Sequence, residues 1–443
     1  MAKNNKIANF AIDSDPANPQ IIPAGSQGSS YADRALQGVD YHQFAPRFGF
    51  AYSLPDNKTV LRGGYGIFYS NLTTAGGMQS MEINPPNHLR VNLTTNPTNP
   101  TLFLDQGFPA GALSPADATN VELVSYDTSG IWPMAQEWNF NIQRELPGGI
   151  LFEVGYFGNK LDHMWRQFDG NPASPVPGNV NANRRYTSVL VPGTTDTISL
   201  ADVIRIQKDG YSDYNALQAK VEKRYSKGLT FIGAYQYSKT IGLGDTTGVQ
   251  NPLDWAADRS VVSQNMTRHF VGSAVYELPF GKGRAFGANW NRFANGVLGG
   301  WSVGPIVTVD SGLPLNLTVD GNPSNSGPYG ADRPNVVGNW QLPNPTVQEW
   351  FNTAAFVKNA PYTYGDAGRN ILRGPGLFNL DLAAHKQFRI SERFTAQLRL
   401  ESFNATNTPP LGAPNTVVGS PQFGQISTAG TPRDNQIGLK ILF

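Results

Sequence analysis

The sequence predicts an all-β protein: an antiparallel transmembrane β-barrel, or part of one, with long external loops. Three observations lead to this prediction. Apolar and polar residues alternate along many segments, most of these segments are long, and the connections between them are alternately short and long. Helical periodicity does not persist in any window of comparable length.

The alternation is clearest between residues 391 and 405, where Leu398 and Leu400 flank Arg399. A period of two places successive side chains on opposite faces of a strand, so one face is apolar and the other polar. If the apolar face meets lipid, the polar face lines the lumen. The residues expected to face lipid are Phe394, Leu398, Leu400, Trp138 and Phe140, and those expected to face the lumen are Arg399, Glu401, Lys220, Glu222 and Asp381.

About eleven segments show this pattern, and most have ten or more residues. Strands of soluble sheets average about five or six residues, whereas a tilted strand needs about 9 to 11 to cross a membrane. The length of the segments therefore favours a membrane barrel. The predicted strands are residues 45–53, 58–69, 134–146, 149–159, 213–225, 228–239, 267–278, 297–312, 376–389, 391–405 and 433–443.

The connections alternate in length along the chain. Tight turns lie at 55–57, 147–149, 226–228 and 390–391, whereas 70–133, 160–212, 240–266, 313–375 and 406–432 are long and rich in Asn, Pro, Gly, Thr and Ser. Outer-membrane barrels have short periplasmic turns and longer external loops. One connection, 279–296, is intermediate in length and fits least well.

If residue 443 ends on the periplasmic side, every long connection falls outside the cell and every tight turn falls inside. The odd number of strands then places residues 1–44 outside, as an external loop remnant or a disordered N-terminal segment, before a barrel region over 45–443. Bacterial single-chain barrels have even strand numbers, so the chain is expected to be part of a larger barrel.

Composition excludes several functions. The 34 Lys+Arg balance 33 Asp+Glu, so no basic surplus supports nucleic-acid binding. The absence of Cys removes disulfides and thiolate metal sites. The five His are scattered, and HExxH does not occur. We therefore expect neither an enzyme nor a cofactor, while a calcium ion in the loops stays open.

Several stretches resemble the barrel of TonB-dependent outer-membrane receptors of the Oar-like type. They are TRHFVGSAVYELPFGKG at 267–283, LGGWSVG at 298–304, SGLP at 311–314, WFNTAAF at 350–356, GRNILRGPG at 368–376, NLD at 379–381 and ESFNATN at 401–407. The resemblance covers roughly 45–443 and implies a barrel of 22 strands of which this chain is the C-terminal half. It further implies a plug domain, a TonB-contacting segment and a signal peptide upstream, and energy-coupled uptake of a scarce external ligand across the outer membrane.

The last predicted strand ends on an aromatic residue. Its pattern resembles the terminal signal that the barrel-assembly machinery reads in outer-membrane proteins. The residues that carry the resemblance are Ile437, Leu439, Ile441 and Phe443.

Two other functions stay open at this point. One is an outer-membrane porin or adhesin-like barrel without energy coupling, and the other is a soluble all-β carbohydrate-binding or hydrolytic protein. The loops, rich in Asn, Thr, Gly and Pro, fit siderophores, glycans or peptides equally well. The sequence therefore does not identify the ligand.

Overall fold

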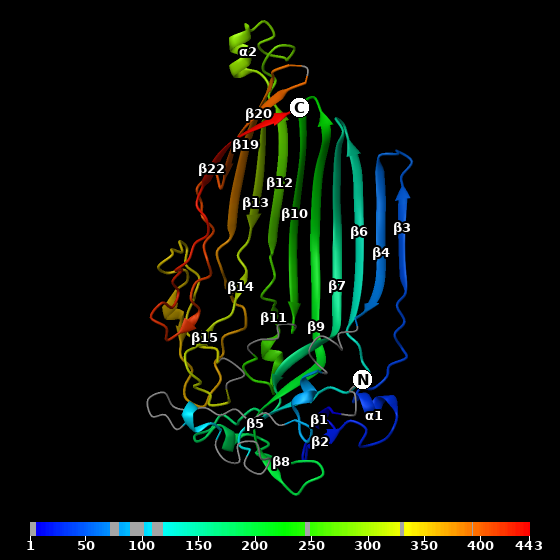
Figure 1. Ribbon diagram of the computed structural model, residues 1–443, viewed down its shortest axis with the longest axis vertical. Coiled ribbons are helices and arrows are strands. Elements are labelled where there is room, and N and C mark those ends of the chain that lie inside the picture. Colours follow the sequence, from blue (N-terminus) through cyan, green and yellow to red (C-terminus); the bar gives the residue numbers. More distant parts are fainter. Residues whose placement is uncertain are drawn as a thin grey trace.

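A computed structural model describes residues 6–70, 79–88, 102–108, 118–243, 249–327, 332–391 and 393–443. Its main feature is one long antiparallel sheet (Figure 1). Eleven strands follow one another in the sheet in the order of the chain. They are β3 (Arg47–Ser53), β4 (Thr59–Tyr69), β6 (Met134–Leu146), β7 (Ile150–Asp169), β9 (Thr197–Ser226), β10 (Leu229–Gly242), β12 (Arg268–Glu277), β13 (Trp301–Asp310), β19 (Leu377–Arg389), β20 (Thr395–Phe403) and β22 (Asp434–Leu442).

Each of these strands coincides with one predicted segment, so the eleven-strand antiparallel sheet is confirmed. The main departure is length. β7 has 20 residues and β9 has 30, because the two strands continue to pair beyond the expected end near residue 159, as far as Asp169 opposite Ile204. The segment 160–212 was predicted to be one long loop. Its first and last parts instead belong to the sheet, as extensions of β7 and β9.

The turn end of the sheet, at the top of Figure 1, has short connections. Asp56 organises the first one, because its carboxylate accepts hydrogen bonds from the backbone N–H groups of Lys58 (3.0 Å) and Thr59 (2.9 Å). Gly148 and Gly149 form the next connection with φ of 84° and 69°, a left-handed conformation that glycine adopts without strain. These connections use the residues that tight hairpins require.

The predicted strand over 297–312 is wrong at its start. Residues Arg292–Leu298 form the helix α2, and β13 begins only at Trp301. The helix forms because the Asn291 side chain accepts a hydrogen bond from the backbone N–H of Ala294 (2.8 Å), which caps the first turn. The intermediate connection over 279–296 is thus a small folded unit beyond the turn end.

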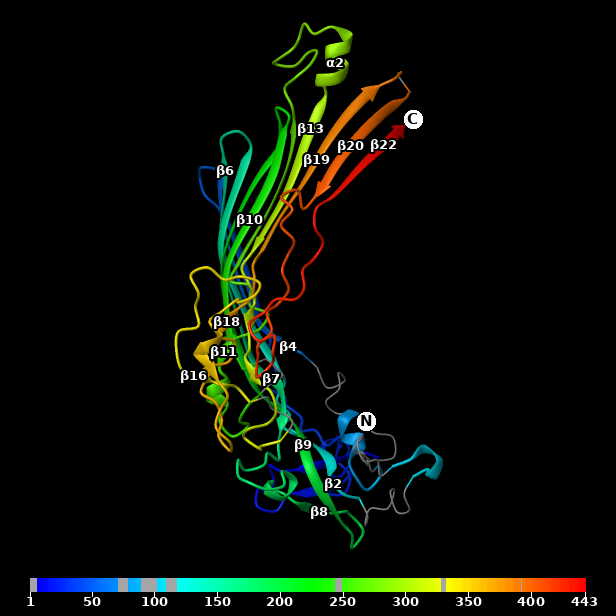
Figure 2. The same ribbon diagram turned by 90° about the vertical axis from the view of Figure 1, so that its left-hand side faces the viewer.

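The opposite end carries the N-terminus, and the described parts of the long connections fold there into an outer layer (Figures 1 and 2). Residues before 45, expected as a loop remnant or a disordered segment, contain two strands and a helix in this layer. The short elements outside the eleven-strand path are β1 (Ala8–Ala11), β2 (Gln20–Pro23), α1 (Tyr31–Ala35), η3 (Gln79–Ile83), η4 (Leu104–Gln106), β5 (Val121–Tyr126), η6 (Asn181–Asn183), β8 (Ser188–Leu190), η7 (Trp255–Asp258), β11 (Ser260–Val261), β14 (Pro314–Leu315), β15 (Thr318–Val319), β16 (Asn335–Val336), η8 (Thr353–Ala355), β17 (Phe356–Val357), β18 (Leu372–Arg373) and β21 (Val417–Val418).

The buried hydrophobic clusters of the described chain lie in this outer layer or where β9 enters it, rather than against the long sheet. On the sheet itself large apolar side chains stay exposed: 44% of Phe140, 50% of Leu217 and 69% of Leu439. A soluble sandwich would bury such a face against a second layer. Among the described residues no such layer covers this sheet, as expected for a barrel wall whose apolar face meets lipid. None of the described helices is long and apolar enough to cross a membrane.

Candidate functional site

The strand register shows which residues share a face of the sheet. Directly opposite residues in an antiparallel pair point to the same side. Phe140 lies opposite Tyr156, and Tyr156 lies opposite Leu217. Further along, Leu400 lies opposite Ile437 and Leu398 opposite Leu439.

The apolar face is continuous across all eleven strands. Residues on it include Phe48, Tyr65, Trp138, Phe140, Tyr156, Leu217, Tyr237, Phe270, Val309, Phe378, Leu382, Leu400 and Ile437. Four of the five residues expected to face lipid therefore lie on one face. The fifth, Phe394, immediately precedes β20. That this face meets lipid stays a prediction.

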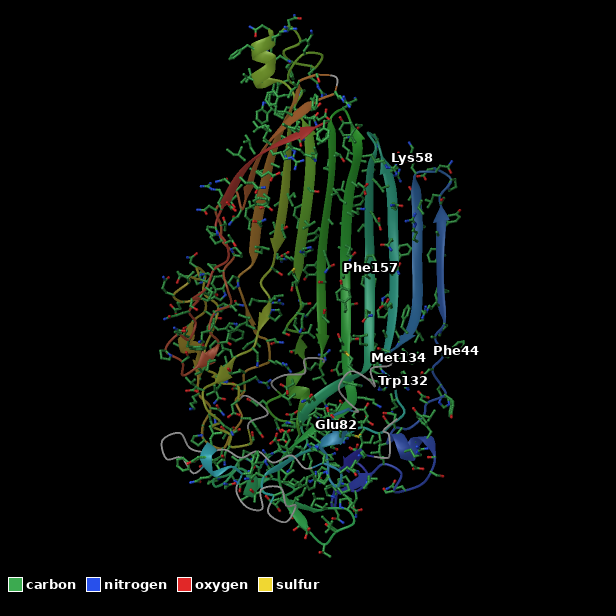
Figure 3. All side chains as sticks on the ribbon, viewed as in Figure 1. Phe44, Lys58, Glu82, Trp132, Met134 and Phe157 are labelled. Atoms are coloured by element: carbon green, nitrogen blue, oxygen red, sulfur yellow. The ribbon has the colours of Figure 1, made fainter. Side chains whose placement is uncertain are left out.

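The residues expected to line the lumen lie together on the other face. Glu153 and Ala234 lie opposite Lys220 on either side, and the Lys220 ammonium contacts the Glu222 carboxylate at 3.0 Å. At the other end of the sheet His385 lies opposite Arg399. Figure 3 shows side chains projecting along the whole sheet, with Phe157 about midway between its two ends.

Glu401 and Asp381, two of the predicted lumen residues, contact residues of neighbouring segments. The imidazole Nε2 of His385 lies 3.5 Å from a Glu401 carboxylate oxygen, and Gln436 donates a hydrogen bond to the same carboxylate. Asp381 accepts a hydrogen bond from the backbone N–H of Asn404 (2.8 Å). These predicted lumen residues thus form hydrogen-bonded networks along the wall.

The final strand forms one edge of the sheet. Ile437, Leu439 and Ile441 lie on the apolar face, opposite Leu400, Leu398 and Ala396. Phe443 follows β22 and is 93% exposed. The edge leaves backbone groups of β22 open for pairing with another strand, which is the geometry that β-augmentation requires.

Lys386 is one of the charged residues that share the apolar face. It lies opposite Trp301 near the turn end, and its ammonium sits 5.4 Å from the Trp301 ring centroid and 5.1 Å from that of Phe388. Its Nζ also donates a hydrogen bond to the carbonyl oxygen of Gly299. A lysine that reaches past aromatic rings toward polar groups is typical of the boundary between lipid and water.

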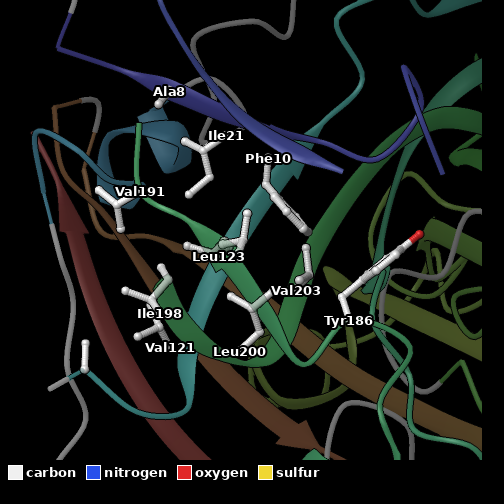
Figure 4. Close-up of a cluster of buried hydrophobic side chains, with 12 residues drawn as sticks. Ala8, Phe10, Ile21, Val121, Leu123, Tyr186, Val191, Ile198, Leu200 and Val203 are labelled. Atoms are coloured by element: carbon white, nitrogen blue, oxygen red, sulfur yellow. The ribbon is translucent and has the colours of Figure 1, made fainter. Parts of the chain in front are cut away.

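The outer layer is the part that sequence reasoning missed. Its largest cluster joins β1, β2, β5, β8 and β9 (Figure 4). Phe10 packs edge-on against Tyr186 with ring centroids 6.1 Å apart. Alternating apolar residues over 121–126 and 198–206 carried a detectable signal, but both segments lay inside stretches classed as loops.

Buried asparagines connect the segments of this layer. The Asn84 amide donates to the carbonyls of Ala8 (2.8 Å) and Val124 (2.7 Å) and accepts from the backbone N–H of Val124 (2.8 Å). The Asn171 amide likewise donates to the carbonyls of Tyr186 and Ala201 (2.8 Å each) and accepts from the backbone N–H of Tyr186 (2.8 Å). Each amide satisfies backbone groups that no strand partner reaches. The abundance of Asn in these loops is therefore partly structural.

Charged pairs are also buried here. Arg184 donates to the Asp169 carboxylate at 2.7 Å, and both side chains are almost fully buried. Arg333 pairs in the same way with Asp258. Burial and the nearby Asp127 charge raise the pKa of Tyr126 to about 12. The two buried ion pairs join separate segments of the outer layer.

A cavity of about 340 Å³ opens between the N-terminal segment and β5. Its wall includes Asn9, Gln37, Asp13 and Arg205. Arg205 is held in place, because its guanidinium donates to the Ser125 hydroxyl (2.6 Å) and to the Asp13 carboxylate. The lining has three charged side chains (Asp13, Asp33 and Arg205) and three amide side chains (Asn9, Gln27 and Gln37) among apolar and hydroxyl residues. In the described ranges no three His, Asp or Glu gather in a way that holds a metal ion.

Comparison with known proteins gives the class. The family model described as outer membrane beta barrel domain matches residues 1–436, so the chain belongs to that family. It is therefore an outer-membrane β-barrel protein. No curated protein matches the chain.

Solved structures that align with the chain are outer-membrane transporters. The transporter YddB from Escherichia coli has 9% identity and a TM-score of 0.45, covering 90% of this chain and 40% of that one. The ferric-catecholate import receptor Fiu from E. coli K12 has 11% identity and a TM-score of 0.40, covering 89% and 34%. The iron transporter FrpB from Neisseria meningitidis (F3-3 variant) has 9% identity and a TM-score of 0.39, covering 90% and 39%. The chain thus spans about two fifths or less of the length of these proteins.

Proposed function

We propose that the chain forms part of the barrel wall and the outer loops of a TonB-dependent receptor that takes up a scarce external ligand. The observation that carries the proposal is the difference between the two ends of the sheet. One end has mainly short turns, and the other carries a folded outer layer with hydrophobic clusters and a cavity. A rigid outer layer suits the capture of a specific ligand, because little ordering is left to be done on binding.

In this proposal the apolar face contacts lipid and the polar face encloses a plug domain. The plug and the TonB-contacting segment belong to the complete receptor, and displacement of the plug by TonB admits the ligand. The barrel-assembly machinery inserts the chain by recognising the final strand. The cavity beside Arg205 is the part of the outer layer where the ligand first makes specific contacts.

A porin or adhesin-like barrel is the second candidate, and its outer loops also lie at one end. The exposed apolar face and the membership of an outer-membrane family count against the third, a soluble carbohydrate-binding protein. The first two candidates differ in energy coupling, which an uptake experiment measures directly.

The test uses the complete receptor in a bacterial host with and without TonB. Ferric siderophores supplied as the sole iron source, and maltodextrins or peptides supplied as the sole carbon source, serve as probes. The proposal expects growth on at least one probe and loss of that growth without TonB. Growth that is independent of TonB would establish the porin reading instead.

A further inference from the structure

The connection between β12 and β13 is the only one at the turn end, within the described residues, that folds into a unit of its own. Phe280 stacks on Trp290 with ring centroids 6.5 Å apart and packs against Phe286 at 5.8 Å. Backbone hydrogen bonds close the loop, from Gly281 N–H to the Phe286 carbonyl (2.8 Å) and from Phe286 N–H to the Pro279 carbonyl (2.9 Å). This unit, residues 279–300, is called the turn module below.

The turn module is fastened to residues of the apolar face. The indole N–H of Trp301 donates to the carbonyl oxygen of Val297 in α2 (2.9 Å). Lys386, which lies opposite Trp301, donates to the carbonyl oxygen of Gly299. Figures 1 and 2 both show α2 beyond the turn end of the sheet, away from the outer layer. The module therefore continues from the apolar face at the turn end of the sheet.

The outer surface of the turn module is apolar. Phe293 is 82% exposed and Val297 is 51% exposed. These two residues are four positions apart in α2, so they lie on one side of the helix. Leu298 adds a further exposed aliphatic side chain at the end of the helix. Nothing in the described part of the chain covers this side.

The charge of the turn module is entirely positive. Residues 279–300 contain Lys282, Arg284 and Arg292 and neither Asp nor Glu. Arg284 pairs with Glu277 at 2.8 Å, at the end of β12. No ion pair is found for Lys282 or Arg292 among the described residues. Two cations next to exposed aromatic and aliphatic side chains form the pattern that binds an anionic membrane surface.

We propose that the turn module is an interfacial anchor that binds anionic phospholipid on the periplasmic side of the outer membrane. Phe293 and Val297 enter the acyl region just below the headgroups, while Lys282 and Arg292 bind phosphate groups. A periplasmic protein is the competing occupant. Phospholipid is favoured because the module is tied to Trp301 and Lys386, and thus to the face that we propose meets lipid.

The experiment uses the absence of Cys in the chain. Single substitutions in the full chain, Phe293→Cys for the module, Phe140→Cys for the apolar face and Lys58→Cys for a tight turn at the same end, each receive an environment-sensitive fluorophore. Figure 3 marks Lys58 at that end. The complete receptor that contains the chain is reconstituted in phosphatidylcholine vesicles with 20% phosphatidylglycerol, and acyl chains of either lipid are brominated in turn to quench the fluorophore.

The expected result is strong quenching at 293, greater with brominated phosphatidylglycerol than with the same mole fraction of brominated phosphatidylcholine. Combining Lys282→Gln with Arg292→Gln is expected to remove that preference, because both of these cations of the module are lost. The label at 140 is expected to be quenched equally by both lipids, and the label at 58 weakly by either.

Weak quenching at 293, equal to that at 58, would overturn the anchor and leave a protein partner as the occupant. Quenching at 293 without preference for phosphatidylglycerol would overturn the anionic specificity. The label at 140 reports separately on the proposed facing of the sheet, on which this inference rests. An incorrect assignment of the apolar face would thus show at position 140, whereas an incorrect anchor would show only at position 293.

Discussion

Placing charge on the apolar face is the sharpest perturbation of the barrel. The double substitution Leu398→Arg with Leu400→Arg is expected to abolish membrane assembly. Leu398 lies opposite Leu439, and Leu400 lies opposite Ile437, so both new side chains would point away from the polar networks. An arginine near the bilayer midplane costs about 2–4 kcal/mol, so two cost about 4–8 kcal/mol. At about 1.4 kcal/mol per factor of ten, folding loses roughly three to six powers of ten in its equilibrium constant.

The other face provides the matched control. Thr395→Arg with Gln397→Arg adds the same charge to the same strand on the polar face, where water or a plug domain solvates it. The milder change Arg399→Gln removes a hydrogen bond from Arg399 Nε to the Gln397 side chain (2.9 Å), which costs about 0.5–1.5 kcal/mol. Both controls are expected to assemble.

The assay is refolding of the complete receptor with each variant into lipid vesicles, followed by the change in gel mobility between unheated and heated samples. The expected outcome is a folded band for both controls and none for the Leu398 and Leu400 double variant. Equal folded fractions for the two double-arginine variants would refute the assignment of the faces.

Three further predictions concern the final strand and the outer layer. Deleting Phe443 is expected to slow insertion by the barrel-assembly machinery; unchanged insertion kinetics in reconstituted vesicles would remove the signal interpretation. Asn84→Ala leaves buried groups of Ala8 and Val124 unpaired, at about 1–3 kcal/mol each, and is expected to increase proteolysis of the outer layer without changing sheet content by circular dichroism. Arg184→Ala leaves the Asp169 carboxylate buried without its partner, so outer-layer stability in urea titrations is expected to fall by about 3–5 kcal/mol. The additional change Asp169→Asn is expected to restore most of that stability. Absence of any recovery would contradict the pairing.

Period-two alternation predicted the sheet because its cause is local. Each side chain of a strand that separates lipid from lumen faces one of these two environments, and its polarity matches that environment. The faces of Leu398 and Arg399 can therefore be assigned without knowing the partner strand. Turns such as the one around Asp56 were predictable for the same reason, since their residues hydrogen-bond within three positions. The eleven strands and their order follow from these local signals.

The outer layer could not be predicted in this way. Phe10 packs against Tyr186, and Asn9 hydrogen-bonds to Tyr126, so their contacts join segments separated by more than a hundred residues. The sequence of a short apolar run between prolines and glycines does not indicate which distant segment it packs against. The extension of β7 and β9 was missed because β9 changes environment along its length, from the membrane sheet to a layer with its own core.

The helix α2 was missed for a third reason. Its seven residues are too few for a helical period to emerge, and Val297 and Leu298 extend the apolar pattern of the strand that follows. The capping residue Asn291 was the available signal.

One measurement tests most directly whether hydrocarbon surrounds the apolar face. Nitroxide labels are placed one at a time on cysteines at positions 396 to 401 of this chain within the vesicle-inserted complete receptor, and collision rates with oxygen and with a water-soluble nickel chelate are recorded. The account predicts oxygen maxima at 398 and 400 and nickel maxima at 397, 399 and 401. Nickel maxima at 398 and 400, or rates without a two-residue period, would contradict it.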